Sequence, residues 1–505
     1  MENKEVLSED IQNAVQERKS MMAFDKASFS KLIISDLSKT KDGRGLLKKY
    51  KQSEVREIIE NFKLERNQIR LREISQILFA KSPQYQRLLR YFSDMALFSY
   101  VIAPIKNIKK LNKNKVLKQY EEIGELMKLM SLKHEMQKVL RTAFAEDVFF
   151  GYVHKEKKSF YIQKVDASIA KISSVEDGVI NWAIDMSYFE RDESVLASWA
   201  TEVQVKYREW KALKGKNPKI GTYVELDARN TICIKVNEEM LDVIFPPFAG
   251  TFDSIFDIDG FKQLRKDKEE LGNYMMITQK LPIRTDTDNN NDFAIDKDTF
   301  TYFHNMIVDG VPENVGVITS PMEVEALKFE KDRADNDGVG KSTRDFWEGT
   351  GTSQLLFSSD NTTSQGLLMS IKSDEEIVFA LITQIQRWLN RYLKYQFNEL
   401  MFNVDILHVT HYNRSEMFKM YLEAGQYGVP TKNKLSAVVG FEPIETMNMA
   451  YLENDLLKMH EEFIPLMSSH TQSAEDIASA TGGAPKKEAE ELSDEGARAQ
   501  DKPNA

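Results

Sequence analysis

Apolar residues recur at steps of three and four along the first part of this chain, a spacing that predicts amphipathic helices. The pattern starts near Ser53 and continues through residues 55–79. Ser82 before Pro83 predicts an N-cap and a first helical position, opening a helix that we expect to continue to Pro104. Another helix is predicted over residues 116–144. Residues 1–50 have weak periodicity, so we expect only a partly ordered arm there.

From Asp147 the pattern changes to short runs rich in β-branched and aromatic residues, which predict strands. The runs are VFFGYVH, SFYIQKV, VINWAID, TYVELD and NTICIKV, with a charged helical stretch over residues 203–213. VINWAID follows the turn signal Glu176-Asp177-Gly178. Helices followed by strands predict an α+β fold for the body of the protein.

Two helix-like runs, residues 258–280 and 341–348, then flank a polar insertion that ends in the strand-like VGVITSPMEVEALKF. Pro282 is expected to stop the first run. The Ser/Thr/Asn/Gly loop TGTSQLLFSSDNTTSQG follows at residues 350–366 and leads into a long amphipathic helix. We expect Ser373 and Glu376 to form a capping box for this helix. Its apolar face is predicted to carry Val378, Leu381, Ile385, Trp388 and Tyr392.

A strand-like run, FNVDILHVTHY, comes next, and Asn413 with Glu416 predicts the start of a helix that ends at Gly425 or Gly428. A last helix is expected after Pro443, ending near residue 465. From about residue 471 the chain has few apolar residues and many charges, so we expect a disordered tail.

Composition narrows the functional classes. The 505 residues exceed what one core usually accommodates, which predicts several parts. The single Cys233, in a strand-like run, predicts a buried thiol and a reducing compartment. The charged N-terminus has no signal-peptide core, and the longest apolar stretch, MALFSYVIA, is too short to span a membrane. A net charge of -10 argues against a protein that grips DNA tightly.

Three motif fragments suggest chemistry but lack essential parts. GVGKST at residues 338–343 resembles the end of a phosphate loop, yet Asp335 occupies the position that needs the first glycine. DTDNNND at residues 286–292 resembles a calcium loop, yet Asn291 and Lys297 stand where Gly and Glu are required. His408 and His411 are expected on opposite faces of a strand. We therefore predict no enzymatic activity, no cofactor and no metal site.

Three phrases carry a resemblance to a known family: VINWAIDMSYF (residues 179–189), VIFPPFAGTFDSIFDIDGFK (243–262) and HVTHYNRSEMFKMYLEAGQYG (408–428). With the order of the runs between them, they resemble the portal proteins of tailed double-stranded DNA phages, in particular those that infect Gram-positive bacteria. The resemblance covers about residues 88–467. It implies a homo-oligomeric ring, a dodecamer in the family, that conducts double-stranded DNA at one capsid vertex of the virion.

The same resemblance implies the partners and the parts. The partners would be the terminase large subunit, head-completion or adaptor proteins, and major capsid and scaffolding proteins, met first in the host cytoplasm during assembly. The implied parts are, in chain order, an arm (1–50), a wing (51–250), a first stem helix (251–283), a clip (284–330), a second stem helix (331–349), a tunnel loop (350–366), the long helix and strand of the wing (367–412), a crown (413–468) and the tail (469–505).

The implied sites lie in the loop and the insertion. The DNA-facing tunnel loop would present short polar side chains and one acid: Ser358, Ser359, Asp360, Asn361, Thr362, Thr363 and Ser364. Polar residues of the clip would dock partner proteins: Asp286, Asp288, Asn290, Glu313 and Asn314. Neutral hydroxyl and amide groups can exchange phosphate contacts, whereas Asp360 opposes a fixed grip.

The sequence leaves alternatives open for two segments and for the protein as a whole. The loop at residues 350–366 has a composition that fits an ordinary surface loop equally well. The six lysines between Lys106 and Lys118 fit a solvated helix start better than a contact with DNA or an acidic partner, because no aromatic residues interleave with them. For the whole protein, the second hypothesis is a non-enzymatic head-tail adaptor or minor capsid structural protein.

Overall fold

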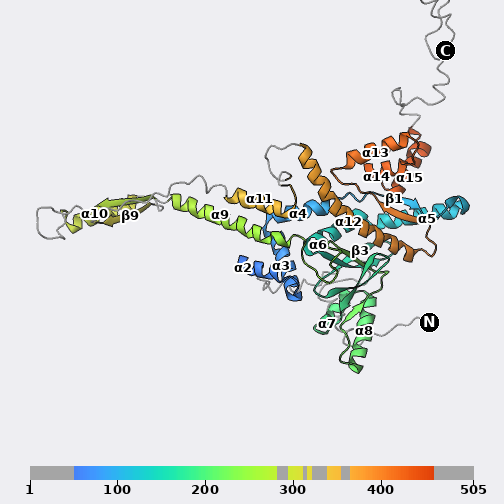
Figure 1. Ribbon diagram of the computed structural model, residues 1–505, viewed down its shortest axis with the longest axis horizontal. Helices are drawn as coiled ribbons and strands as arrows, with labels where there is room; N and C mark the ends of the chain where they lie inside the picture. The colour runs from blue at the N-terminus through green and yellow to red at the C-terminus, as the bar shows by residue number, and fades with distance from the viewer. Residues whose placement is uncertain are drawn as a thin grey trace, which may run out of the picture. The chain divides into compact units, whose positions relative to one another are not determined.

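The protein is described from a computed structural model, which covers residues 50–273, 275–280, 294–310, 315–320, 338–353, 356 and 364–459 (Figure 1). The chain divides into two compact units, Met1–Pro443 and Ile444–Ala505. The expected arm and tail lie outside the described residues, apart from Tyr50. The first unit mixes helices with small sheets, so the expected α+β class is confirmed.

The described part of the first unit begins with the helices α2 (Gln52–Glu60), α3 (Glu65–Lys81), α4 (Pro83–Asp94), α5 (Lys113–Met130) and α6 (Leu132–Glu146). The expected cap of α4 is confirmed, because Ser82 Oγ accepts a hydrogen bond from Tyr85 N at 3.3 Å. The expected length of α4 was wrong. The residues before Pro104 form strand β1 (Tyr100–Pro104), which pairs with β10 (Phe402–Ile406). Pairing with a distant strand overrides the local helical pattern.

The helix predicted over residues 116–144 is two helices. The chain breaks at Ser131, whose φ of 50° and ψ of 56° are left-handed, a conformation that ends α5 before α6 begins. Met130 and Leu132 are buried on either side of this break. The turn therefore redirects the chain within the core, a change that apolar periodicity alone does not reveal.

Two three-stranded antiparallel sheets form the β-rich part. The first has the order β3 (Phe160–Val165), β2 (Val148–Lys155), β7 (Thr231–Lys235), and the second has the order β4 (Ala170–Glu176), β5 (Val179–Asp185), β6 (Tyr223–Glu225). The predicted turn is confirmed: Asp177 and Gly178 have φ of 53° and 71° and join β4 to β5 as a two-residue hairpin loop. Strand β4 was not predicted, because KISSVE is mostly exposed and has few apolar residues.

Strand β2 separates two hydrophobic cores. Phe149 and Val153 belong to the larger core, with the buried faces of the helices, whereas Phe150 and Tyr152 belong to the second core. Successive side chains of a strand point to opposite faces, so a strand buried on both faces reads as a continuous apolar run. Cys233 on β7 is buried in the second core, and burial raises the pKa of its thiol, as expected for an unreactive cysteine.

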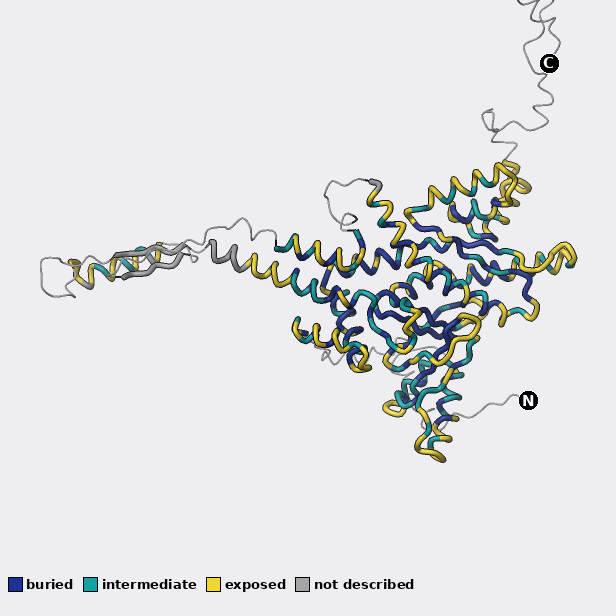
Figure 2. The backbone as a smooth tube through the Cα atoms, in the orientation of Figure 1, coloured by how far each residue is buried: buried dark blue, intermediate teal, exposed yellow. Residues whose placement is uncertain are grey.

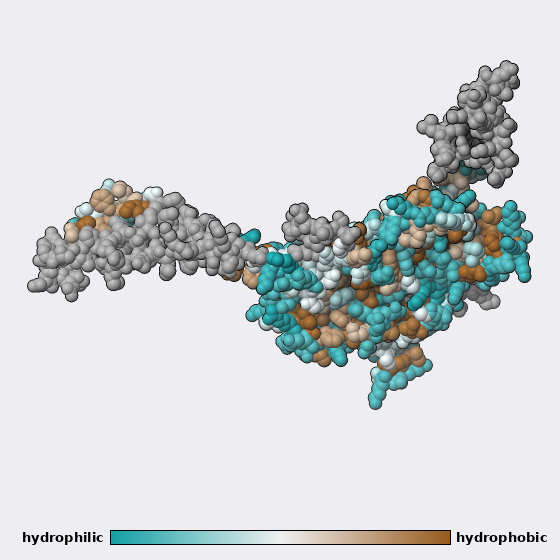
Figure 3. Space-filling view, turned by 45° about the horizontal axis from the view of Figure 1, so that its top comes forward, coloured by the Kyte–Doolittle hydropathy of each residue, from teal (hydrophilic) through white to brown (hydrophobic). Residues whose placement is uncertain are grey.

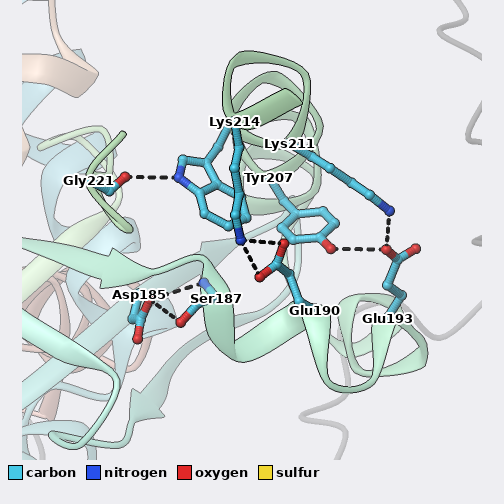
Figure 4. A network of polar contacts seen from close by, with 9 residues as sticks. Asp185, Ser187, Glu190, Glu193, Tyr207, Lys211, Lys214 and Gly221 are labelled. Atoms are coloured by element: carbon cyan, nitrogen blue, oxygen red, sulfur yellow. Dashed lines mark hydrogen bonds and ion pairs between the residues drawn. The ribbon is translucent and has the colours of Figure 1, made fainter. Parts of the chain in front are cut away.

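Helix α8 (Thr201–Lys216) closes the second core together with α7 (Ser187–Glu190) and the 3-10 turn η3 (Glu193–Ser198). Figure 4 shows how polar contacts fasten it. Trp210 Nε1 donates to Gly221 O at 2.9 Å, and Lys214 Nζ contacts both carboxylate oxygens of Glu190 at 2.8 and 2.7 Å. Tyr207 O–H donates to Glu193 at 3.0 Å. These contacts hold α8 with its buried face in the second core.

Helix α12 (Ser364–Gln396) is the long helix expected from the sequence, and its predicted apolar face is buried. Trp388 Nε1 donates to Thr231 O at 2.8 Å, which fixes the helix against β7. The predicted capping box was wrong. The helix begins at Ser364, so Ser373 and Glu376 lie inside it and are exposed, whereas Asp374 and Glu375 between them are buried.

After β10, the first unit ends with α13 (Arg414–Gln426) and α14 (Lys432–Val439). Asn413 precedes α13 as expected, but its side chain accepts from Thr410 N at 2.8 Å and does not cap the helix. Helix α14 was not predicted, and it contributes Ala437 and Val438 to a small third core with Val101. In the second unit, α15 (Pro443–Tyr451) continues into a π-helical turn at Leu452–Leu456.

Candidate functional site: the helical hairpin, the insertion and the loop

Helices α9 (Phe252–Asn273) and α11 (Gly338–Thr350) pack together as a hairpin. Thr251, just before α9, lies against Gly349, whereas Phe261, nearly three turns later, lies against Gly338. One residue number rises as the other falls, so the helices are antiparallel. The Phe261 ring sits so close to Gly338 that a Cβ there would be 2.9 Å from it. This glycine permits the close approach of the two helices.

The base of the hairpin is anchored in the larger core. Phe252, Ile258 and Phe346 are buried there, and the Phe252 ring meets Tyr85 edge to face at 5.6 Å between centroids. Arg56 of α2 forms an ion pair with Asp253 at 2.8 Å. Farther along α9, Phe261 and Leu264 are exposed. Figure 2 shows the outer part of this helix, where it is described, as largely exposed. The base is therefore fixed by the body, whereas the outer part presents apolar side chains to solvent.

The described residues of the insertion between these helices form a β-α-β unit. Strand β8 (Met275–Lys280) pairs in parallel with β9 (Val315–Ser320), and α10 (Lys297–Gly310) connects them. The expected strand in VGVITSPMEVEALKF is confirmed at its start. The helix predicted over residues 258–280 was wrong in its last six residues, because MMITQK is strand β8. Its β-branched and unbranched apolar residues pair with a strand 40 positions later, which local periodicity cannot predict.

Helix α10 exposes a group of large apolar side chains in the single chain. Tyr302 is 67% exposed and Met306 53% exposed, and Phe303 between them is also exposed. Brown residues mark part of this helix in Figure 3. The described part of the insertion is a two-stranded sheet with one helix, which is at the lower limit of what folds independently. An unburied apolar face on such a unit indicates a surface that another chain covers.

Nearly all of the predicted site residues lie outside the described residues. This applies to the five clip residues, Asp286, Asp288, Asn290, Glu313 and Asn314, and to Ser358, Ser359, Asp360, Asn361, Thr362 and Thr363 of the loop. Ser364 is described, and the prediction that it belongs to the loop was wrong, because it is the first residue of α12. The roles of these residues stay predictions.

Two buried acids lie where the first half of α12 meets the body. Asp374 Oδ2 accepts from the Tyr91 hydroxyl of α4 at 2.9 Å, and Glu375 accepts from the Thr410 hydroxyl. Burial raises the pKa of Asp374 to about 6, and the Tyr91 hydrogen bond opposes this only in part. Burial also raises the pKa of Glu375. These acids follow the loop closely in the chain, and sequence periodicity gave no sign of them because they interrupt an apolar face.

The phosphate-loop fragment is helical. GVGKST forms the first turns of α11, and Thr343 Oγ1 donates to Val339 O at 2.7 Å, so its hydroxyl is used within the helix. Calcium-like residues 286–292 lie outside the described residues. His408 and His411 lie beyond the end of β10, and the His408 ring stacks on Phe379 at 4.6 Å. In the described parts, no cluster of acids, histidines or cysteines could hold a metal.

Among the described helices, none is both long and apolar enough to cross a membrane. No protein-family profile matches the chain, and no curated protein matches it. Among solved structures, the chain is similar to one described as "Neck of empty GTA particle computed with C6 symmetry". The identity is 10% and the TM-score 0.42, over 70% of this chain and 94% of that chain. A likeness this distant carries no argument about this chain's function.

Proposed function

We propose that this chain is a non-enzymatic structural subunit of a phage-type virion and, more specifically, a portal subunit that assembles into a ring around a DNA channel. One observation carries the proposal. The chain leaves its body on α9, forms a small β-α-β unit, returns on α11 and, after the loop, enters the 33-residue α12. This order matches the stem, clip, stem, loop and long helix that the sequence resemblance implies.

The exposed face of α10 supports assembly. A cyclic, head-to-tail interface buries the same surface of every subunit against a different surface of its neighbour. Tyr302 and Met306 would then be covered in the ring, so that an insertion too small to bury its own apolar face becomes stable. The loop that ends at α12, repeated around the axis, would narrow the channel. Its short polar side chains would let DNA slide without a fixed grip.

The partners follow from the same arrangement. Asp286, Asp288, Asn290, Glu313 and Asn314 would form the surface on which the terminase large subunit docks, and later the head-completion proteins. Capsid and scaffolding proteins would contact the body. The alternative, a head-tail adaptor, would use the α10 face for a different protein and would not form a channel by itself.

Assembly is tested by native mass spectrometry of the full chain and of the variant Tyr302→Ser/Met306→Ser. We expect closed rings for the natural chain and mostly monomers for the variant. The control is Val175→Ser/Leu213→Ser, which removes two comparably exposed apolar side chains from β4 and α8. If the two variants assemble equally well, the α10 face does not mediate ring formation.

The loop is tested separately by deleting residues 359–363. We expect rings to form normally and DNA retention in particles to fall. Unchanged packaging and retention in particles with intact rings would contradict the tunnel-loop role.

A further inference from the structure

The segment between β1 and the first turns of α5 concentrates positive charge on an acidic protein. Residues 100–120 contain no Asp or Glu, although the whole chain has a net charge of -10. The lysine surface, as we name it, consists of six exposed side chains: Lys106, Lys109, Lys110, Lys113, Lys115 and Lys118. It spans the 3-10 turn η2 (Ile108–Lys110) and the start of α5. Figure 2 shows this segment as largely exposed.

This surface already holds one carboxylate. Glu399, from the connection between α12 and β10, receives Lys106 Nζ at 3.2 Å and Lys115 Nζ at 2.8 Å on its two oxygens. These two lysines lower the pKa of Glu399. Lys109, Lys110 and Lys113 have no ion pair with any other described residue. Lys106 and Lys115 thus hold one carboxylate between them, whereas Lys109, Lys110 and Lys113 are left for another chain.

Apolar side chains are interspersed with the lysines. Ile105 is 50% exposed and Leu117 is 43% exposed, and Ile108 is similarly exposed. In Figure 3, brown residues lie among teal ones at the right-hand edge, the end where Figure 1 places α5. A solvated helix start has no need of three exposed branched side chains. Their presence favours a partner that brings apolar groups as well as negative charge.

The type of cationic side chain on this surface favours a protein partner over a nucleic acid. Residues 100–130 contain no arginine, the side chain best suited to bidentate phosphate contacts. The α5 N-terminus is also not free to bind an anion, because Asn112 Oδ1 accepts from Asn114 N at 2.9 Å and Lys115 N at 3.4 Å. The backbone of double-stranded DNA presents phosphates and sugars. It therefore offers no large apolar group to the exposed isoleucine and leucine side chains.

We propose that the lysine surface, with Ile105, Ile108 and Leu117, is a docking site for an acidic polypeptide segment that carries apolar side chains between its carboxylates. The segment belongs to another protein. It would occupy Lys109, Lys110 and Lys113, because Lys106 and Lys115 pair with Glu399 and Lys118 pairs with Glu122. The inference does not depend on ring formation, because every group that it uses lies on one chain.

The test measures fluorescence anisotropy of three labelled probes with the full-length protein. The probes are a peptide of repeated Glu-Leu-Glu units, the same peptide with Ser in place of Leu, and a duplex DNA of about 30 base pairs, a length comparable to sites used for protein–DNA binding. The variant Lys109→Glu/Lys110→Glu/Lys113→Glu removes the available charges. The matched control is Lys157→Glu/Lys158→Glu/Lys219→Glu, which reverses three exposed lysines elsewhere.

We expect the lysine variant to bind the Glu-Leu peptide about tenfold or more weakly, since three charge pairs are lost, and the control to bind it as the natural chain does. The Ser peptide should bind the natural chain several-fold more weakly than the Leu peptide. Variant Ile108→Ser/Leu117→Ser should abolish that preference. Equal losses for both lysine variants, no binding of either peptide, or tighter binding of the DNA through the same lysines would each overturn the proposal.

Discussion

Removing the charge of Asp374 should stabilise the protein near neutral pH. Its carboxylate is buried on α12, and the hydroxyl of Tyr91 is the hydrogen-bond donor that reaches it at 2.9 Å. The neighbouring acid Glu375 is buried beside it, and the ion pair between Lys372 and Glu416 is exposed. Asparagine keeps an oxygen for the Tyr91 hydroxyl and removes the buried charge. The substitution Asp374→Asn is thus close to isosteric.

The size of the effect follows from the pKa. Burial raises the pKa of Asp374 from 3.8 to about 6, a difference that would correspond to about 3 kcal/mol if fully expressed in the free energy of unfolding. Solvent at the edge of this junction screens part of it, so we expect about 1–2 kcal/mol. Because the folded pKa is the higher one, the natural chain gains stability as pH falls from neutrality through 6 towards 3.8.

The assay is urea denaturation followed by tryptophan fluorescence, at pH values from about 4.5 to 7.5, the range in which the carboxylate titrates. The difference in unfolding free energy between Asp374→Asn and the natural chain should be largest at the upper end and shrink towards the lower end. Glu376→Gln is the matched control, because Glu376 is exposed on the same helix. A difference that does not change with pH, or a variant less stable than the natural chain near neutrality, would refute the reasoning.

Three further substitutions test the packing that holds the candidate site in place, each by urea denaturation. Lys235→Ala should cost about 3–5 kcal/mol, because it leaves the fully buried Asp147 without its cation; a loss below about 1 kcal/mol would contradict this. Gly151→Ala should cost about 1–3 kcal/mol, since its Cβ would lie 2.5–2.7 Å from three apolar side chains, whereas Gly221→Ala, with nothing within 4 Å, should be nearly neutral. Ser82→Ala should cost about 1 kcal/mol through loss of the cap, and no loss would mean that the cap is dispensable.

The sequence predicts best those elements whose own apolar residues show which of their faces are buried. Strands β2, β5 and β7 are buried on both faces, so their apolar runs leave little choice of structure. Helix α12 was predicted for a related reason, because its buried face extends over many turns. The first residue of α12 was not predicted, because polar residues around Asp374 and Glu375 resemble the start of a helix. Tertiary packing buries these two acids inside it.

The errors occur where a distant partner decides the structure. Tyr100 pairs with Ile406 and Met275 with Val315, and in both cases a segment read as the end of a helix is a strand. The left-handed Ser131 is likewise a product of the core around it. Long-range pairing is not encoded in local periodicity, so the apolar pattern of these segments cannot reveal their strands.

The candidate site could be predicted only as an order of elements. The hairpin of α9 and α11 and the following α12 appear in that order, whereas the predicted contact residues of the clip and of residues 358–363 lie outside the described residues. The lysine surface was visible as charge, but its carboxylate partner was not. Glu399 is 293 residues from Lys106, and only the fold brings them together.

The most direct test of the central claim is negative-stain electron microscopy of the purified full-length protein, with class averages viewed along the particle axis. A portal subunit should form closed rings of identical subunits around an open central channel. Uniform monomers or dimers at micromolar concentration and above, or compact particles without a channel, would contradict it.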